Sequence, residues 1–272
     1  MAEQGYSESD SPQGTPTREV GRHLAVTAGI AALLATVLTA WRPASLDPAE
    51  LVGQLLAIGG PAEPAAAPAA GLAQGAERLP IGVVAGHSGL HPDSGLADPG
   101  AVCDDGLTEL EVNSAVAELV IGGLEGAGLE AVQLEEWDPR LNGFRGLALI
   151  SIHADSCQPI NETATGYKIT TALDTAVPDR SQRLMACVAD RYGRATGMRF
   201  HPNSVTLDMT EYHSFYEIHS QTPAAIIEVG FLFLDRGFLT RNPDLAARGI
   251  VEGLLCYVNN EPATLPLESP PG

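Results

Sequence analysis

Three apolar segments of this sequence end on a side chain that can bind a metal ion or carry a proton. The runs V-V-A-G-H, L-I-S-I-H and A-A-I-I-E end at His87, His153 and Glu228, and G-L-T-E places Glu109 at the start of a predicted helix. Open α/β sheets have their sites at the carboxyl ends of the strands, so these side chains are expected in one pocket. Two imidazoles and a carboxylate form a ligand set of catalytic zinc sites. A second carboxylate, here Glu228, can then serve as general base.

Each of these residues has a plainer interpretation. A single histidine at a strand end is more often a hydrogen-bonded or surface residue than a ligand. The repetition of one arrangement at three strand ends favours the metal site. Glu111 is an alternative to Glu109. On a helix it would point about 200° away from Glu109, and Val112, which starts the predicted buried face, favours Glu109 as the ligand.

The elements that must position these residues alternate between strand and helix. Short apolar runs predict strands, and apolar residues at helical spacing predict helices. This alternation indicates an α/β fold with a mostly parallel, twisted sheet flanked by helices. The predicted strands are 81–85, 129–134, 147–152, 167–171 and 224–228, and the predicted helices are 109–124, 180–196 and 245–257.

The charge of the chain excludes one class of function. The 272 residues include 34 acidic and 15 basic side chains, which gives a formal net charge of -19, and Lys168 is the only lysine. Such a chain repels nucleic-acid phosphates, so no nucleic-acid partner is expected. Hydrophobic residues make up 44% of the chain, enough to bury a core in at least part of it.

The N-terminal part contains a candidate membrane segment. Leu24–Trp41 has no charged residue, and as a helix it would span about 27 Å, close to the thickness of a bilayer core. Arg18 and Arg22 precede it and Arg42 follows it, which favours a cytoplasmic N-terminus with the remaining chain outside the cytoplasm. The alternatives are a cleaved signal peptide, which would release a secreted protein, and a buried helix.

Composition divides the chain into five parts. Residues 1–23 are polar and are expected to be disordered on the cytoplasmic side. The transmembrane anchor, 24–41, leads into a linker rich in Pro and Ala, 42–78. The folded catalytic domain is expected over 79–260, and the tail, 261–272, contains four prolines and is expected to be flexible.

Residues 80–258 contain a series of motifs in a fixed order. G-H-S-G at 86–89 follows the first strand, D-P-G-A follows at 98–101, and then comes Glu109. S-I-H-A-D lies at 151–155 and I-E-V-G-F at 227–231. This combination resembles the zinc-dependent N-acetylmuramoyl-L-alanine amidase family (the amidase_3 type), whose motifs are G-H-G-G, D-x-G-A, S-I-H-A-N and V-E-x-G-F.

The chain departs from these motifs at a few positions. Ser88 replaces a glycine and Asp155 replaces an asparagine, and the segment between His87 and Asp98 is longer than usual. None of these changes removes an expected ligand.

The resemblance implies roles for individual residues. It implies that His87, Glu109 and His153 bind Zn²⁺ and that Glu228 is catalytic. An arginine upstream of S-I-H is usual in the family, and Arg140 stands in the matching place as a candidate substrate-binding residue.

The resemblance also implies the reaction and the fold. The substrate would be peptidoglycan, and the bond cleaved would join the lactyl group of N-acetylmuramic acid to L-alanine. The fold would resemble that of the zinc exopeptidases, here preceded by one transmembrane helix. The activating protein partner, if the enzyme has one, is not indicated.

Two other functions fit part of the pattern. One is a zinc metallopeptidase or amidase acting on other short peptides, since the fold resembles zinc exopeptidases. The other is a non-catalytic module that binds or regulates the cell wall, although a binding module has no need of a base such as Glu228.

The segment 201–221 is rich in polar and aromatic residues and precedes the last strand. It is predicted either as a surface loop or short helix or as a lid over the metal, in which His213 would bind the substrate.

The four cysteines contain no C-x-x-C pair. Cys103 and Cys157 flank the predicted site, and a disulfide between them would suit an exported domain. The alternatives are free thiols or additional metal ligands. Cys187 and Cys256 lie in apolar helical stretches and are predicted as core residues, which could also pair between neighbouring helices.

Overall fold

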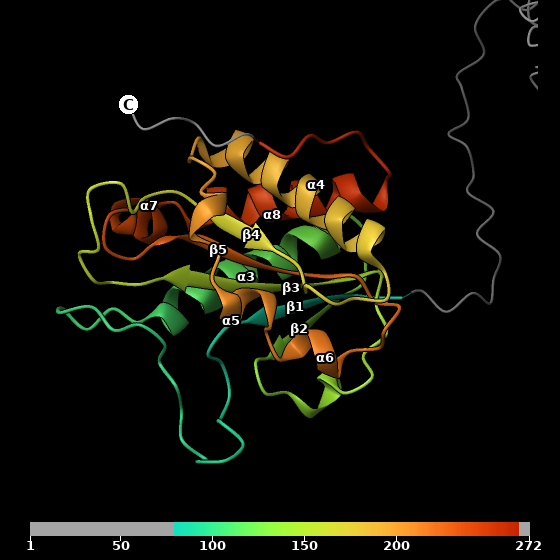
Figure 1. Ribbon diagram of the computed structural model, residues 1–272, viewed down its shortest axis with the longest axis horizontal. Coiled ribbons are helices and arrows are strands. Elements are labelled where there is room, and N and C mark those ends of the chain that lie inside the picture. The colour runs from blue at the N-terminus through green and yellow to red at the C-terminus, as the bar shows by residue number, and fades with distance from the viewer. Residues whose placement is uncertain (1–78, 267–272) are drawn as a thin grey trace, which may run out of the picture. The chain divides into compact units, whose positions relative to one another are not determined.

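The computed structural model describes residues 79–266 (Figure 1). In this part of the chain five strands form one sheet in the order β2-β1-β3-β5-β4. Four of the strands are parallel, and β4 runs antiparallel to β5 at one edge. The strands are β1 (Ile81–Ala85), β2 (Ala131–Glu135), β3 (Ala148–Asp155), β4 (Lys168–Thr170) and β5 (Ala224–Phe231).

Three long helices cover one face of the sheet. α3 packs against β1, β2 and β3, α4 packs against β4 and β5, and α8 packs against both α3 and α4 (Figure 1). Pro178 and Pro243 occupy the first turns of α4 and α8, where a missing backbone N–H costs no helical hydrogen bond. The bounds of the three helices are α3 (Glu109–Gly126), α4 (Pro178–Thr196) and α8 (Pro243–Val258).

The other helical segments are short. Three of them, η3, α5 and α6, lie in the segment 201–221 that was predicted as a loop, short helix or lid. They are η2 (Pro139–Leu141), η3 (Pro202–Ser204), α5 (Leu207–Thr210), α6 (Ser214–Glu217) and α7 (Arg236–Arg241).

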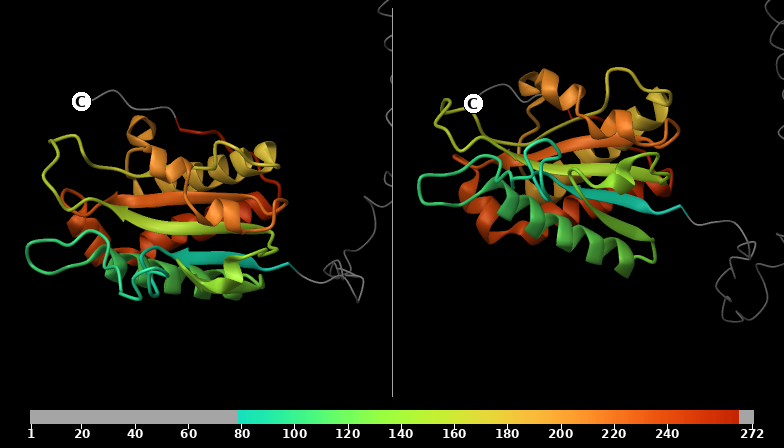
Figure 2. Two further views of the ribbon diagram at one scale, coloured as in Figure 1. Left: turned by 60° about the horizontal axis from the view of Figure 1, so that its bottom comes forward. Right: turned by 90° about the horizontal axis from the view of Figure 1, so that it is seen from below.

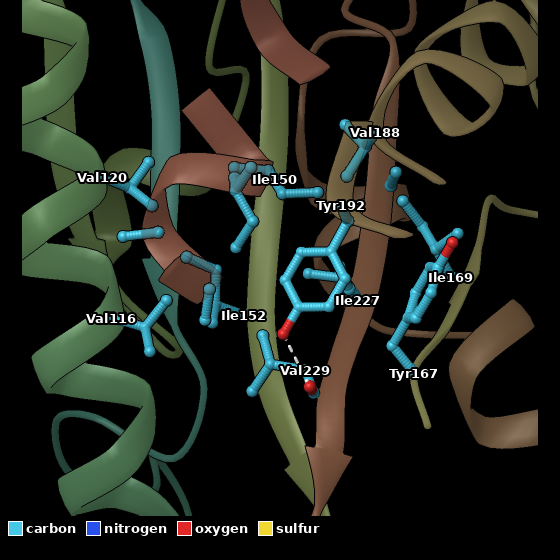
Figure 3. Close-up of a cluster of buried hydrophobic side chains, with 14 of the residues drawn as sticks. Val116, Val120, Ile150, Ile152, Tyr167, Ile169, Val188, Tyr192, Ile227 and Val229 are labelled. Atoms are coloured by element: carbon cyan, nitrogen blue, oxygen red, sulfur yellow. Dashed lines mark hydrogen bonds between the residues drawn. The ribbon is translucent and has the colours of Figure 1, made fainter. Parts of the chain in front are cut away.

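The main core lies between the sheet and the three long helices. Side chains of α3, β3 and β5 meet there, and the Tyr192 hydroxyl donates a hydrogen bond of 2.6 Å to the Val229 carbonyl oxygen (Figure 3). Alternate residues of each strand point to opposite faces. Ile150 and Ile152 of β3 belong to this core, whereas Leu149 belongs to a smaller cluster on the other face.

This alternation fixes where the chemistry can lie. His153 follows Leu149 and Ser151 at even spacing, and Glu228 follows Ile226, so both side chains point away from the three long helices. The segment of residues 201–223 covers that face, as the bond between the Tyr212 and Ser151 hydroxyls shows (3.1 Å).

The loops that follow the parallel strands leave the sheet at the same end, the carboxyl ends of the strands. Figure 2 shows β1, β3 and β5 running in the same direction, with the loops 86–108 and 156–166 leaving from the same end of the sheet. Disulfide Cys103–Cys157 joins these two loops, as expected from the sequence. A covalent link across the two loops restricts their separation next to the strand ends.

The α/β fold with a mostly parallel sheet is confirmed, and the predicted elements are present with shifted ends. The largest shifts are at the ends of β3 and β5, which continue to Asp155 and Phe231 instead of ending at Ile152 and Glu228. The strand predicted over 129–134 runs from Ala131 to Glu135. Cys187 and Cys256 are fully buried, as predicted, and also form a disulfide between α4 and α8.

The predicted transmembrane segment, 24–41, lies outside the described residues, as do 1–23 and 42–78. Among residues 79–266, none of the helices has the length and apolar character needed to span a bilayer. Of the predicted tail, residues 261–266 are described, and they contain no helix or strand.

Candidate metal centre and active site

His87 follows β1 in a conformation that few residues other than glycine adopt. Its φ is 64°, in the left-handed region that costs energy for a side chain with a Cβ. The His87 backbone N–H donates a hydrogen bond to the Glu136 carboxylate. The side chain is held at both nitrogens, with Nδ1 3.0 Å from Asp98 Oδ2 and Nε2 3.2 Å from Glu109 Oε2. These contacts offset the strain and aim the imidazole at Glu109.

Glu109 is the first residue of α3 and is 6% exposed. Its Oε1 lies 3.1 Å from His153 Nδ1, and its Oε2 accepts the Ala101 N–H at 3.1 Å. The neighbouring alternative, Glu111, is used differently. It closes a capping box with Thr108 by accepting the Thr108 N–H at 2.9 Å, which satisfies free donors at the helix start. Glu109 therefore faces the two histidines, and Glu111 serves the helix terminus.

The three predicted ligands converge. One ligand atom from each of His87, Glu109 and His153 lies within 4.8 Å of the others. His153 Nε2 is buried and has no hydrogen-bond partner in the described chain. A buried nitrogen without a partner is costly unless a ligand binds it. Two imidazoles and one carboxylate suit a divalent metal ion such as zinc, so the donor set fits.

Glu228 lies beside the predicted ligand His153, on the neighbouring strand. Its Cα is paired with the Cα of His153 in the β3–β5 ladder, and its Oε2 is buried without a hydrogen-bond partner in the described residues. Burial raises the pKa of the Glu228 carboxyl to about 7, against the opposing charge of His153. A carboxyl with this pKa can accept and return a proton near neutral pH.

These side chains line one cavity of about 560 Å³, called the metal cavity below. One wall of it comes from α5 and the residues that follow it, including Asp208, Tyr212 and His213. His213 stacks on Trp137 with 3.8 Å between ring centroids, and its Nδ1 lies 2.9 Å from Glu217 Oε1. The structure thus brings His213 to the metal cavity, where the sequence had placed it as a candidate.

Arg140 is placed differently. It lies in η2, outside the residues that line the metal cavity, and its side chain is 61% exposed. Its guanidinium donates to the Asp138 carboxylate and to the Gln133 carbonyl oxygen. The structure does not bring Arg140 together with the ligands.

Sequence reasoning missed Glu136. It follows β2, is 6% exposed and lines the metal cavity. Its Oε2 accepts the His87 N–H, and its Oε1 lies 3.5 Å from His213 Nε2. The available signal was its place directly after a strand that neighbours β1, the same arrangement that pointed to the ligands.

The carboxylates determine the charge of the histidines. Burial alone would lower the pKa of His87, but the hydrogen bond and charge of Glu109 and the charge of Glu136 raise it to about 9. Burial would also lower the pKa of His153, but the hydrogen bond to Glu109 and the charges of Glu228, Glu136 and Glu109 together raise it. Burial would raise the pKa of Glu109, but its two imidazole partners hold it well below the usual range.

Comparison with known proteins places this chain in a family. The N-acetylmuramoyl-L-alanine amidase family, Amidase_3, matches residues 81–254, so the chain belongs to this family. It is accordingly an N-acetylmuramoyl-L-alanine amidase, a hydrolase that acts on peptidoglycan.

Solved structures share the fold. The amidase Ami1 from Mycobacterium smegmatis is 18% identical, with a TM-score of 0.52, covering 67% of this chain and 98% of that chain. The CwlD amidase from Clostridioides difficile, solved in complex with the GerS lipoprotein, is 17% identical, with a TM-score of 0.52, covering 67% and 100%. A separate comparison with curated proteins found no match.

A substitution at Gly86 tests the packing around the predicted ligands. A Cβ at this position would lie 2.3 Å from Cε1 of the His153 ring, so Gly86→Ala must displace that imidazole. We expect its metal affinity to fall about tenfold or more, as for other changes that reorient a ligand. A competitive titration with a chelating dye measures this. The control is Gly122→Ala in α3, where a Cβ meets nothing within 4 Å. Equal affinities for the two variants would contradict the assignment.

Metal binding is expected to release protons and to weaken in acid. In the metal-free protein the pKa of His87, raised to about 9, keeps its ring protonated at neutral pH, and the pKa of His153 is raised as well. A metal must displace the protons that these rings carry. Affinity should therefore decrease as the pH falls. Calorimetric titration with zinc at pH 7, in two buffers of different ionisation enthalpy, reports the protons released. Full retention of the metal after dialysis at pH 4 would show that these rings are not ligands.

Proposed function

We propose that this chain is a zinc-dependent enzyme that cleaves the amide bond between N-acetylmuramic acid and L-alanine in peptidoglycan. His87, Glu109 and His153 hold the zinc ion, and Glu228 is the general base. The observation that carries the proposal is the convergence of three ligand atoms within 4.8 Å beside an unpaired buried carboxylate, in a chain of this family.

The residues divide the chemistry between them. A bound zinc ion supplies a Lewis acid that acidifies water and polarises a carbonyl group. Glu228 takes a proton from the attacking water as the new C–O bond forms at the lactyl carbonyl carbon. It then returns the proton to the alanine nitrogen as the C–N bond breaks. The products are a free lactyl carboxylate on the sugar and a stem peptide with a free amino terminus.

His213 is proposed to contact the substrate. It lines the metal cavity, and Trp137 and Glu217 fix its ring. The contacts with Glu136 and Glu217 raise its pKa against the effect of burial, which favours the form of the ring with a proton on both nitrogens. Arg140 remains a candidate only for parts of the substrate that extend beyond the metal cavity.

The enzyme is proposed to act outside the cytoplasm. The apolar run 24–41 would anchor it as a single-pass membrane protein, with 42–78 as a spacer and 79–260 as the catalytic domain, or would be cleaved to release it. The two disulfides support this placement, because disulfides persist in oxidising compartments.

Glu228→Gln tests the base. The amide is nearly the same size but cannot take a proton, so we expect the rate of amide cleavage to fall by about 10²–10⁴-fold with metal content unchanged. Purified peptidoglycan serves as substrate, and mass spectrometry detects released peptides that begin with L-alanine. Glu111→Gln is the matched control, because that carboxylate serves the helix cap. If the two variants keep equal activity, Glu228 is not the base.

His213→Ala tests the proposed substrate contact. We expect the rate of release of stem peptides from peptidoglycan to fall about tenfold or more, because a hydrogen bond to the substrate is lost, while zinc content stays the same. Elemental analysis gives the zinc content. Unchanged activity would assign this segment to a surface role.

A further inference from the structure

A second cavity lies beside the metal cavity. It has a volume of about 370 Å³ and shares Asp155 with the metal cavity. Its other walls come from the loop after β3 and from the segment before α5, and include Asn161, Thr163 and Thr206. We propose that this second cavity binds the N-acetylated sugar ring of the substrate, while the stem peptide lies in the metal cavity. The proposal rests on the amidase function given above.

Lys168 lines the second cavity beside Asp155, the residue that both cavities share. Its Cα is paired with the Cα of Glu228 in the antiparallel β4–β5 ladder, and residues opposed in this way place their side chains on the same face. Its Nζ lies 2.5 Å from Asp155 Oδ2 and donates to the Ser204 carbonyl oxygen at 2.9 Å. The second cavity therefore begins next to the general base. When the amide bond of a substrate lies at Glu228, a group attached directly to that bond reaches the second cavity.

The two cavities differ in charge. Carboxylates dominate the metal cavity, which has no lysine or arginine in its lining. The charged residues that line the second cavity are Asp155 and Lys168, which pair with each other, with side chains 18% and 5% exposed. An ion pair satisfied in this way leaves little net charge for a ligand to meet. Because the sugar is the uncharged part of the substrate and the stem peptide carries its ionisable groups, the sugar suits the second cavity.

The walls of the second cavity also match an acetamido sugar. Hydroxyl and amide side chains, those of Thr163, Thr206 and Asn161, can bond to ring hydroxyls and to the acetamido group. Phe231 and the half-exposed Ile160 provide apolar surface for the C–H face of the ring and the acetyl methyl. A concave site with apolar walls and a few placed polar groups is the usual form of a small-molecule site.

Thr206→Trp is the variant that fills this cavity. Thr206 is exposed and precedes α5, and its side chain makes no capping hydrogen bond, so the larger ring can enter the cavity without removing a bond from the helix. Thr206→Ser is the matched control that keeps the cavity open. Glu228→Gln tests whether sugar binding is independent of cleavage.

The first measurement is saturation-transfer NMR of free N-acetylmuramic acid with the purified protein. We expect transfer to the acetyl methyl in the unmutated protein, in Thr206→Ser and in Glu228→Gln, and loss of transfer in Thr206→Trp. Absence of transfer in the unmutated protein, or equal transfer in Thr206→Trp, would overturn the proposal. Loss of transfer to the dipeptide L-alanyl-D-isoglutamine in Thr206→Trp, with transfer to the sugar retained, would assign the cavity to the peptide and would also overturn it.

The second measurement compares two substrates with the same scissile bond. One is N-acetylmuramyl-L-alanyl-D-isoglutamine, and the other carries only a D-lactoyl group in place of the whole muramyl residue. We expect Thr206→Trp to lower kcat/KM about tenfold or more for the first and to leave the second unchanged. An equal effect on both would contradict the sugar assignment. Failure of the unmutated protein to cleave either substrate would refute the amidase function, while the NMR result would still decide what the second cavity binds.

Discussion

Several ionisable side chains of opposite sign are buried together at the carboxyl ends of the parallel strands. The free energy needed to remove them from water constrains the placement of the neighbouring side chains and loops. Glu109 meets this cost by lying between His87 and His153, at 3.2 and 3.1 Å. A buried charge is tolerated only where a partner of opposite charge or a hydrogen bond compensates it. Glu228 has no such compensation at Oε2, and its raised pKa is the result. The burial that surrounds His87, Glu109 and His153 thus also gives Glu228 its proton affinity.

The backbone is shaped to permit this arrangement. Gly86 leaves room for the His153 ring, and Gly100, at φ 65°, leaves room for Glu109 and His87. The Cys103–Cys157 disulfide then ties together the loops that follow β1 and β3. Strand ends supply the direction of the side chains, glycines supply the space, and the covalent link limits how far the loops can separate.

The two cavities lie next to each other, which leaves space on both sides of a bond placed at Glu228. Amide hydrolysis needs room on both sides of the scissile bond, and Asp155 lines both cavities. Its partner Lys168 is the only lysine in the chain. At position 155 this chain has an aspartate where the related motif has an asparagine, and the aspartate carboxylate neutralises the buried ammonium. The pair therefore divides an acidic cavity from one with little net charge.

The sequence by itself determined the α/β class, the order of the elements and the identity of His87, Glu109, His153 and Glu228 as a group. It could do so because apolar periodicity follows directly from which face of an element is buried, and because parallel strands end at one edge. It also favoured the Cys103–Cys157 pairing, which the structure contains.

Only the tertiary structure decided the contacts that depend on several distant segments. Glu136 became part of the site because β2 lies beside β1, and Arg140 lies outside the metal cavity because its guanidinium is bound by Asp138. The Lys168 pairing needed the antiparallel placement of β4 against β5. Strand order and side-chain packing are cooperative properties of the whole domain, so no local pattern along the chain encodes them.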